Sequence, residues 1–131
     1  MNKPRVLVVE DNKDLRRLYT FALSLSGLEV EAAEDGKAAL TLLRAERPDV
    51  ILTDIQMPNM DGIELIKCIK TDAELVGLPV IALSACGEEQ LRRAKSAGAA
   101  RVLEKPIDPF TLSDEVWELL TAKDVCTKKA A

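Results

Sequence analysis

Histidine is absent from this sequence of 131 residues. Catalytic triads with a histidine base and metal sites with imidazole ligands are therefore excluded. The three cysteines, Cys68, Cys86 and Cys126, lack the C-x-x-C spacing of zinc or redox motifs, so neither a disulfide framework nor a zinc site is expected. Any chemistry of this chain must rest on carboxylates, amines and hydroxyls.

Long apolar runs are also missing, and none approaches the roughly 20 residues that a membrane-spanning helix needs. The N-terminus passes at once into a short apolar segment that is soon ended by acids, unlike a secretory signal. The formal net charge of −4 opposes direct nucleic-acid binding, because neutralising phosphates needs clustered Lys and Arg. We expect a cytoplasmic domain that neither enters a membrane nor contacts nucleic acid directly.

Short apolar runs rich in β-branched residues alternate along the chain with stretches of helical periodicity. This alternation predicts five strands, at Arg5–Val9, Glu29–Ala33, Asp49–Thr53, Pro79–Leu83 and Arg101–Glu104. Strands that are apolar on both faces indicate a parallel sheet covered by helices on both sides. The predicted fold is therefore α/β and flavodoxin-like, a doubly wound five-stranded parallel sheet in the order 2-1-3-4-5 with five helices.

Apolar spacing also predicts which faces of the helices are buried. In the first helix these are Leu15, Leu18, Ala22 and Leu25, before a stop at Gly27. The last helix is expected to begin near Asp108-Pro109, a capping residue followed by proline. We expect one domain over residues 4–122, and the polar segment 123–131 is predicted to be a frayed end or the stub of a linker.

In a parallel α/β sheet, ligands bind beyond the carboxyl ends of the strands. Those ends carry Glu10-Asp11, Asp54, Ser84 and Lys105. A single acid at a strand end is commonly a helix cap or a solvated residue. Several converging carboxylates raise one another's pKa unless a cation neutralises them, and oxygen ligands suit Mg²⁺. These residues predict a magnesium site at which a carboxylate can form an acyl phosphate.

Four segments carry a family resemblance, and they read VVEDN at 8–12, DIQMPNMDG at 54–62, SA at 84–85 and KP at 105–106. Together they resemble the signature of response-regulator receiver domains, over about residues 4–122. The run of nine residues from Asp54 is the most specific of them. The resemblance implies a phosphorylation-dependent signalling switch of a two-component system or phosphorelay rather than an enzyme, assisting only its own phosphorylation and dephosphorylation.

The resemblance also implies a role for each matching residue. Asp54 is the expected phosphoacceptor, and Asp11 and Asp54 would bind Mg²⁺ directly. Glu10 would act mainly through metal-bound water, and Gln56 would offer its backbone carbonyl.

Ser84 and Lys105 would hold the phosphoryl oxygens, and the Lys105–Pro106 bond is often cis in the family. The implied partners are a histidine kinase or histidine phosphotransfer protein as donor and an unidentified downstream protein. Gln56 and Cys86 are expected to influence the lifetime of the acyl phosphate.

Several alternatives stay open. A flavin site is disfavoured by the acidic segment after the first strand, and a phosphatase by Gln56, where such enzymes typically have a second Asp. A receiver-like module that is never phosphorylated, or a receiver excised from a hybrid kinase or larger regulator, remains possible on sequence. Val102 stands where receivers often carry a switching aromatic, which puts the usual relay in question. Arg92, Arg93 and Lys95 form either an output surface or a solvated helix face.

Overall fold

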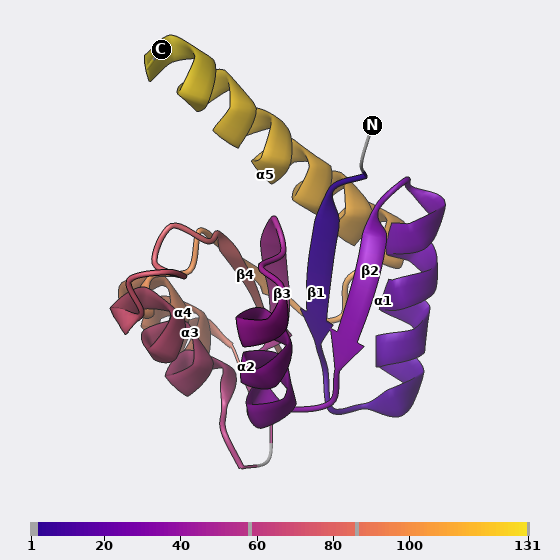
Figure 1. Ribbon diagram of the computed structural model, residues 1–131. Helices are drawn as coiled ribbons and strands as arrows, with labels where there is room; N and C mark the ends of the chain where they lie inside the picture. The colour runs from indigo at the N-terminus through magenta and orange to yellow at the C-terminus, as the bar shows by residue number, and fades with distance from the viewer. Residues whose placement is uncertain (1–2, 58, 86, 131) are drawn as a thin grey trace.

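The structure, a computed structural model, describes residues 3–57, 59–85 and 87–130. Strands and helices alternate along this chain, as the sequence predicts (Figure 1). The strands are β1 (Arg5–Val9), β2 (Glu29–Ala33), β3 (Val50–Asp54), β4 (Val80–Ser84) and β5 (Arg101–Glu104). The helices are α1 (Lys13–Leu25), α2 (Gly36–Ala45), α3 (Gly62–Thr71), α4 (Glu88–Ala97) and α5 (Pro109–Ala130).

All neighbouring strands are parallel, in the order β2-β1-β3-β4-β5, which confirms the predicted topology. Strands β3 and β4 each lie one residue later than predicted. Their last residues, Asp54 and Ser84, therefore belong to the ladder, opposite Leu83 and Glu104 respectively. The backbones of two expected site residues are thus fixed by sheet hydrogen bonding rather than by a loop.

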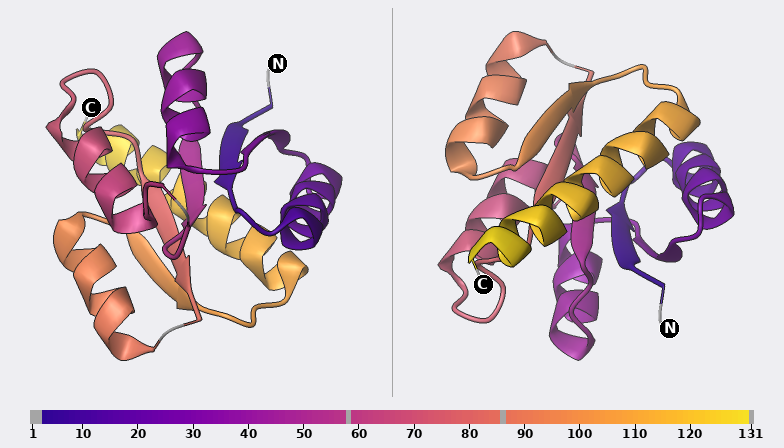
Figure 2. Two further views of the ribbon diagram at one scale, coloured as in Figure 1. Left: turned by 90° about the horizontal axis from the view of Figure 1, so that it is seen from below. Right: turned by 90° about the horizontal axis from the view of Figure 1, so that it is seen from above.

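Two hydrophobic cores sandwich the sheet, and the helices divide between them (Figure 2). Helices α2, α3 and α4 cover one face, with Leu43, Ile66 and Ala94 among their buried residues. Helices α1 and α5 cover the other face, where Leu23 and Leu112 are buried. Strand side chains supply both cores because successive residues of a strand point to opposite faces. This explains why the runs Val6–Val9, Val50–Leu52 and Val80–Leu83 within β1, β3 and β4 are apolar on both faces.

The buried face of α1 differs from the prediction. Leu18 and Leu25 are 46% and 62% exposed, whereas Tyr19 and Leu23 are buried. Ala22 is buried and Leu15 packs against the core, as predicted, so the buried face is turned only partly from the predicted one, toward Tyr19 and Leu23. The predicted stop is confirmed, since the helix ends at Leu25 and Gly27 has a φ of 95° that favours glycine.

Helix α5 begins at Pro109, as predicted, but its backbone stays helical to Ala130 and its last turns extend past the sheet (Figure 1). For residues 123–131 the sequence predicts a frayed end or the stub of a linker. This segment contains neither glycine nor proline, so nothing in the sequence interrupts the helix. None of the helices in the described part of the chain combines the length and apolar character needed to span a bilayer.

Candidate functional site

The carboxyl ends of β1, β3, β4 and β5 meet at one edge of the sheet, where backbone hydrogen bonds extend the strand pairing by one residue. The amide of Ile55 donates to the carbonyl of Leu83 at 2.9 Å, and the amide of Lys105 donates to that of Ser84 at 2.9 Å. The ladder thereby holds the segments that carry Asp54, Ser84 and Lys105 in register. Ser84 is fully buried at this edge.

Lys105 joins two of the predicted acids. Its Nζ donates a hydrogen bond to Oε1 of Glu10 at 2.7 Å and lies 3.5 Å from Oδ1 of Asp54. Glu10 is 1% and Asp54 is 7% exposed, so both carboxylates are almost wholly removed from water. An ammonium between two buried carboxylates neutralises part of their charge, which makes their burial tolerable.

The third acid, Asp11, completes a cluster. One carboxylate oxygen from each of Glu10, Asp11 and Asp54 lies within 4.8 Å of the others. Opposite oxygen ligands of an octahedral Mg²⁺ are about 4 Å apart, so small side-chain adjustments suffice to bring these oxygens onto one ion. An all-oxygen set of this size and charge fits Mg²⁺, and because Asp11 is exposed the site is open to solvent.

Burial and the neighbouring charges of the cluster shift the pKa values of Asp54 and Lys105. Burial, together with the charge of Glu10, raises the pKa of Asp54 from 3.8 to about 6, although Lys105 opposes the shift. For Lys105 burial lowers the pKa, but its hydrogen bond to Glu10 and the charges of Asp54 and Glu10 outweigh this and raise the pKa overall. The site therefore combines a fully charged lysine with excess negative charge, which a divalent cation would relieve.

Helix capping, the common role of an acid at a strand end, is carried by other residues. Asn12, Asp35 and Asp61 accept hydrogen bonds from backbone amides at the starts of α1, α2 and α3. Within the described residues, the carboxylates of Asp11 and Asp54 accept no hydrogen bond from a backbone amide. Their oxygens are directed to the cluster instead.

Helix α1 contributes residues that the sequence analysis did not assign. The amide of Asn12 donates to Oε2 of Glu10 at 3.1 Å, and the guanidinium of Arg16 donates to the carbonyl of Glu10 at 2.8 Å. Burial raises the pKa of Tyr19, and the charges of Lys105, Glu10 and Asp54 also act on its phenol. The site residues predicted from the sequence all lie at or just after strand ends. Arg16 lies one helical turn beyond the cap Asn12, and this spacing could have indicated that its side chain reaches the end of β1.

Gly62 has a structural role at the start of α3. A Cβ at this position would stand 2.8 Å from the Cα of Ile55 and would also collide with the carbonyl of Asp54. The amide of Gly62 donates to the carbonyl of Ile55 at 2.7 Å. Close approach of α3 to the strand end, rather than an unusual backbone angle, therefore requires glycine here.

Three other predictions concern the loops around the site. The Lys105–Pro106 bond is cis, as expected. Gln56 is exposed just after β3, and the role of its carbonyl stays a prediction. Cys86, expected to influence the lifetime of the acyl phosphate, lies outside the described residues.

The carboxyl edge of this doubly wound sheet carries an acidic cluster, a buried hydroxyl and a lysine. The family model for the response regulator receiver domain matches residues 6–116. The chain belongs to this family, whose members serve two-component signalling.

Individual relatives agree with this assignment. The chain is 40% identical over 105 residues to the polar-differentiation response regulator DivK of Brucella anthropi, covering 78% of this chain and 84% of DivK. It is 33% identical to the probable transcriptional regulator ycf27 of Cyanophora paradoxa, over 92% of this chain but only 49% of that protein.

Solved structures agree as well. The chemotaxis protein CheY4 of Vibrio cholerae superimposes with a TM-score of 0.84 at 32% identity, over 89% of this chain and 98% of CheY4. The receiver domain of the Francisella response regulator 1452 gives 0.85 at 32% identity, over 92% and 99%. The flavodoxin-like arrangement predicted from the sequence is thus shared with experimentally determined receivers.

Proposed function

We propose that this domain is a signalling switch in which Asp54 accepts a phosphoryl group from a phosphohistidine of a histidine kinase or phosphotransfer protein. The observation that carries the proposal is the position of Lys105 Nζ, 2.7 Å from Glu10 and 3.5 Å from Asp54. A cation held against a buried carboxylate, beside two further acids, suits the transfer of an anionic group.

The chemistry is a displacement at phosphorus. A carboxylate oxygen of Asp54 attacks the phosphorus of the phosphohistidine, the P–N bond breaks, and a C–O–P acyl phosphate forms. The imidazole of the donor leaves and takes a proton from solvent. Lys105 and the Ser84 hydroxyl are proposed to contact the phosphoryl oxygens. Water later attacks the phosphorus, which releases inorganic phosphate and restores the carboxylate.

Receiver domains bind Mg²⁺ at an acidic pocket, and Glu10, Asp11 and Asp54 form such a cluster here. We propose that these residues, with the backbone carbonyl of Gln56, hold the ion. When bound, Mg²⁺ supplies positive charge that offsets the negative charge of the phosphoryl group. Affinity should be weak, because few protein ligands and several retained waters make a partial cage.

The alternative of a module that is never phosphorylated requires these acids to be structural. Among the described residues Asn12, Asp35 and Asp61 cap α1, α2 and α3, so capping does not account for Asp11 or Asp54. The burial of Asp54 beside Glu10 also costs stability, as its raised pKa shows. An unstable arrangement of this kind is typical of functional sites.

Labelling with radioactive acetyl phosphate in Mg²⁺ tests the proposal. Asp54→Asn should abolish the label, whereas the matched control Asp49→Asn, before the opposite end of β3, should retain it. Most of the label surviving in Asp54→Asn would refute the assignment. Asp11→Ala should remove Mg²⁺ binding and labelling together, and an unchanged Mg²⁺ affinity by isothermal titration would refute the ligand set.

A further inference from the structure

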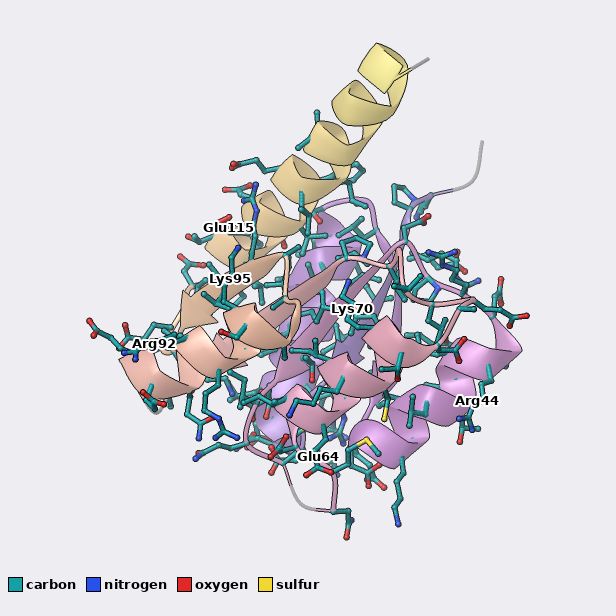
Figure 3. The ribbon with its side chains drawn as sticks, turned by 90° about the vertical axis from the view of Figure 1, so that its left-hand side faces the viewer. Arg44, Glu64, Lys70, Arg92, Lys95 and Glu115 are labelled. Atoms are coloured by element: carbon teal, nitrogen blue, oxygen red, sulfur yellow. The ribbon has the colours of Figure 1, made fainter. Side chains whose placement is uncertain are left out.

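An open groove of about 300 Å³ lies between α3 and α4. Figure 3 shows these two helices side by side, with Arg92 on α4 and Lys70 on α3. The groove is lined by Ile63 and Lys67 of α3 and by Arg92, Arg93, Ser96 and Ala97 of α4. Lining residues on each helix are spaced by three or four positions, so both helices direct one face toward it.

All the charged side chains that line the groove are positive, although the whole chain carries a formal charge of −4. A second hollow, of about 190 Å³ near Arg44, shows what an ordinary charged surface looks like here. It combines Arg44 and Arg47 with Glu46, Asp72 and Glu74. The cationic character of the α3–α4 groove is therefore local and does not follow from composition.

These cations are poorly neutralised within the molecule. In the part of the chain that the structure describes, Lys67 and Arg93 form no ion pair. Arg92 lies 3.4 Å from Glu89, but both side chains are about 70% exposed, and such a pair contributes little. Their donors are available to a ligand.

The composition of the cluster differs from what the sequence suggested. Lys95 was grouped with Arg92 and Arg93, but its Nζ donates to the carbonyl of Ala100 at 3.1 Å. Lys67 joins the arginines instead, from a helix more than 20 positions earlier in the chain. Between the cations, Ile63 is buried and Ala97 half-buried, so the base of the groove is apolar.

We propose that the α3–α4 groove binds an acidic peptide segment of a partner protein, with Lys67, Arg92 and Arg93 contacting carboxylates on both sides of an apolar side chain. Guanidinium groups pair with carboxylates in bidentate geometry, and an apolar base favours a peptide over a bare anion. The groove needs no phosphoryl group on Asp54, so this inference stands apart from the proposed function.

The probe is the peptide Ac-EELEE-NH2, titrated into ¹⁵N-labelled protein at low salt, with Ac-QQLQQ-NH2 as the uncharged control. Saturable amide shifts are expected at residues 63–67 and 92–97 with the acidic peptide only, and they should weaken as salt rises. Inorganic phosphate producing the same saturable shifts would overturn the proposal, because it would indicate a simple anion site.

Charge-reversal pairs give the matched comparison. Lys67→Glu with Arg93→Glu should raise the dissociation constant about tenfold or more, as expected when two surface attractions become repulsions. The control pair, Arg44→Glu with Arg47→Glu, changes the net charge by the same amount and also replaces exposed residues. It should change the dissociation constant less than about twofold. Equal weakening by both pairs would overturn the proposal. Acetyl-phosphate labelling of both pairs should be normal, which separates this result from the function of Asp54.

Discussion

Lys105 and Glu10 lie 95 positions apart in the sequence, yet their side chains form a 2.7 Å hydrogen-bonded ion pair at the edge of the sheet. Glu10 also accepts from the amide of Asn12, and its own carbonyl accepts from Arg16. The pair therefore connects the carboxyl ends of β5 and β1 and holds the ammonium beside Asp54.

Lys105→Met should destabilise the metal-free protein by about 3 kcal/mol, because Glu10 would keep a buried charge without its main partner. Urea denaturation in EDTA measures this, with the exposed Lys37→Met as control. Adding Glu10→Gln to Lys105→Met should recover much of the loss, since the unpaired charge is then removed. A loss below about 1 kcal/mol in the single variant would show that the pair is unimportant for stability.

Asp54→Asn should stabilise the metal-free protein at pH 8. The folded-state pKa of Asp54, about 6, is above its ordinary value of 3.8, so the acid favours folding when protonated and this contribution is lost as the pH rises through 6. The shift corresponds to about 3 kcal/mol as an upper limit. Urea titrations in EDTA should show the gain at pH 8 and little difference near pH 4. If Asp54→Asn and the unchanged protein had equal free energies of unfolding at pH 8 as well as at pH 4, the raised pKa would be contradicted.

Gly62→Ala should lower the free energy of unfolding by about 2 kcal/mol or more, because the new Cβ would collide with the backbone of Asp54 and Ile55. Labelling of Asp54 should also slow, since the strand end must shift. Gly77→Ala is the matched control, because the nearest atom to its Cβ is 3.5 Å away, on the flexible side chain of Arg47. Thermal melts compare the two, and similar melting temperatures would rule out the steric explanation.

Phosphorylation should produce a response concentrated at residues 84–89 and 105–106, with smaller changes along the outer face of α5. Val102 is half-buried and packs against the core beneath α2, α3 and α4, and a β-branched side chain cannot swing as a ring does. Amide shifts of the Mg²⁺ form with and without beryllofluoride, which stands in for the phosphoryl group, measure this. Shifts limited to the immediate neighbours of Asp54 would exclude a switch.

Strand and helix order could be predicted because apolar periodicity is a local property of the chain. The five strands and the sheet order are confirmed, and so are the starts and stops marked by Gly27 and Pro109. The predicted buried face of α1 was only partly right, because Ala22 is buried and Leu15 packs against the core, whereas Leu18 and Leu25 are exposed and Tyr19 is buried instead. Which side of a helix is buried depends on the elements that pack against it, and the spacing of leucines along the helix does not specify those elements.

The site divides in the same way. The sequence by itself determined which chemical groups reach the carboxyl edge, since parallel strands must end together and Glu10, Asp54, Ser84 and Lys105 follow from that. Only the tertiary structure decided that Lys105 pairs with Glu10, that Arg16 supports it, and that Lys67 rather than Lys95 lies with Arg92 and Arg93. The contact of Lys105 with Glu10 and the position of Lys67 beside the two arginines join distant segments whose distances and angles are set by packing of the two cores, whereas Arg16 lies only six positions from Glu10 and a local spacing could have indicated it.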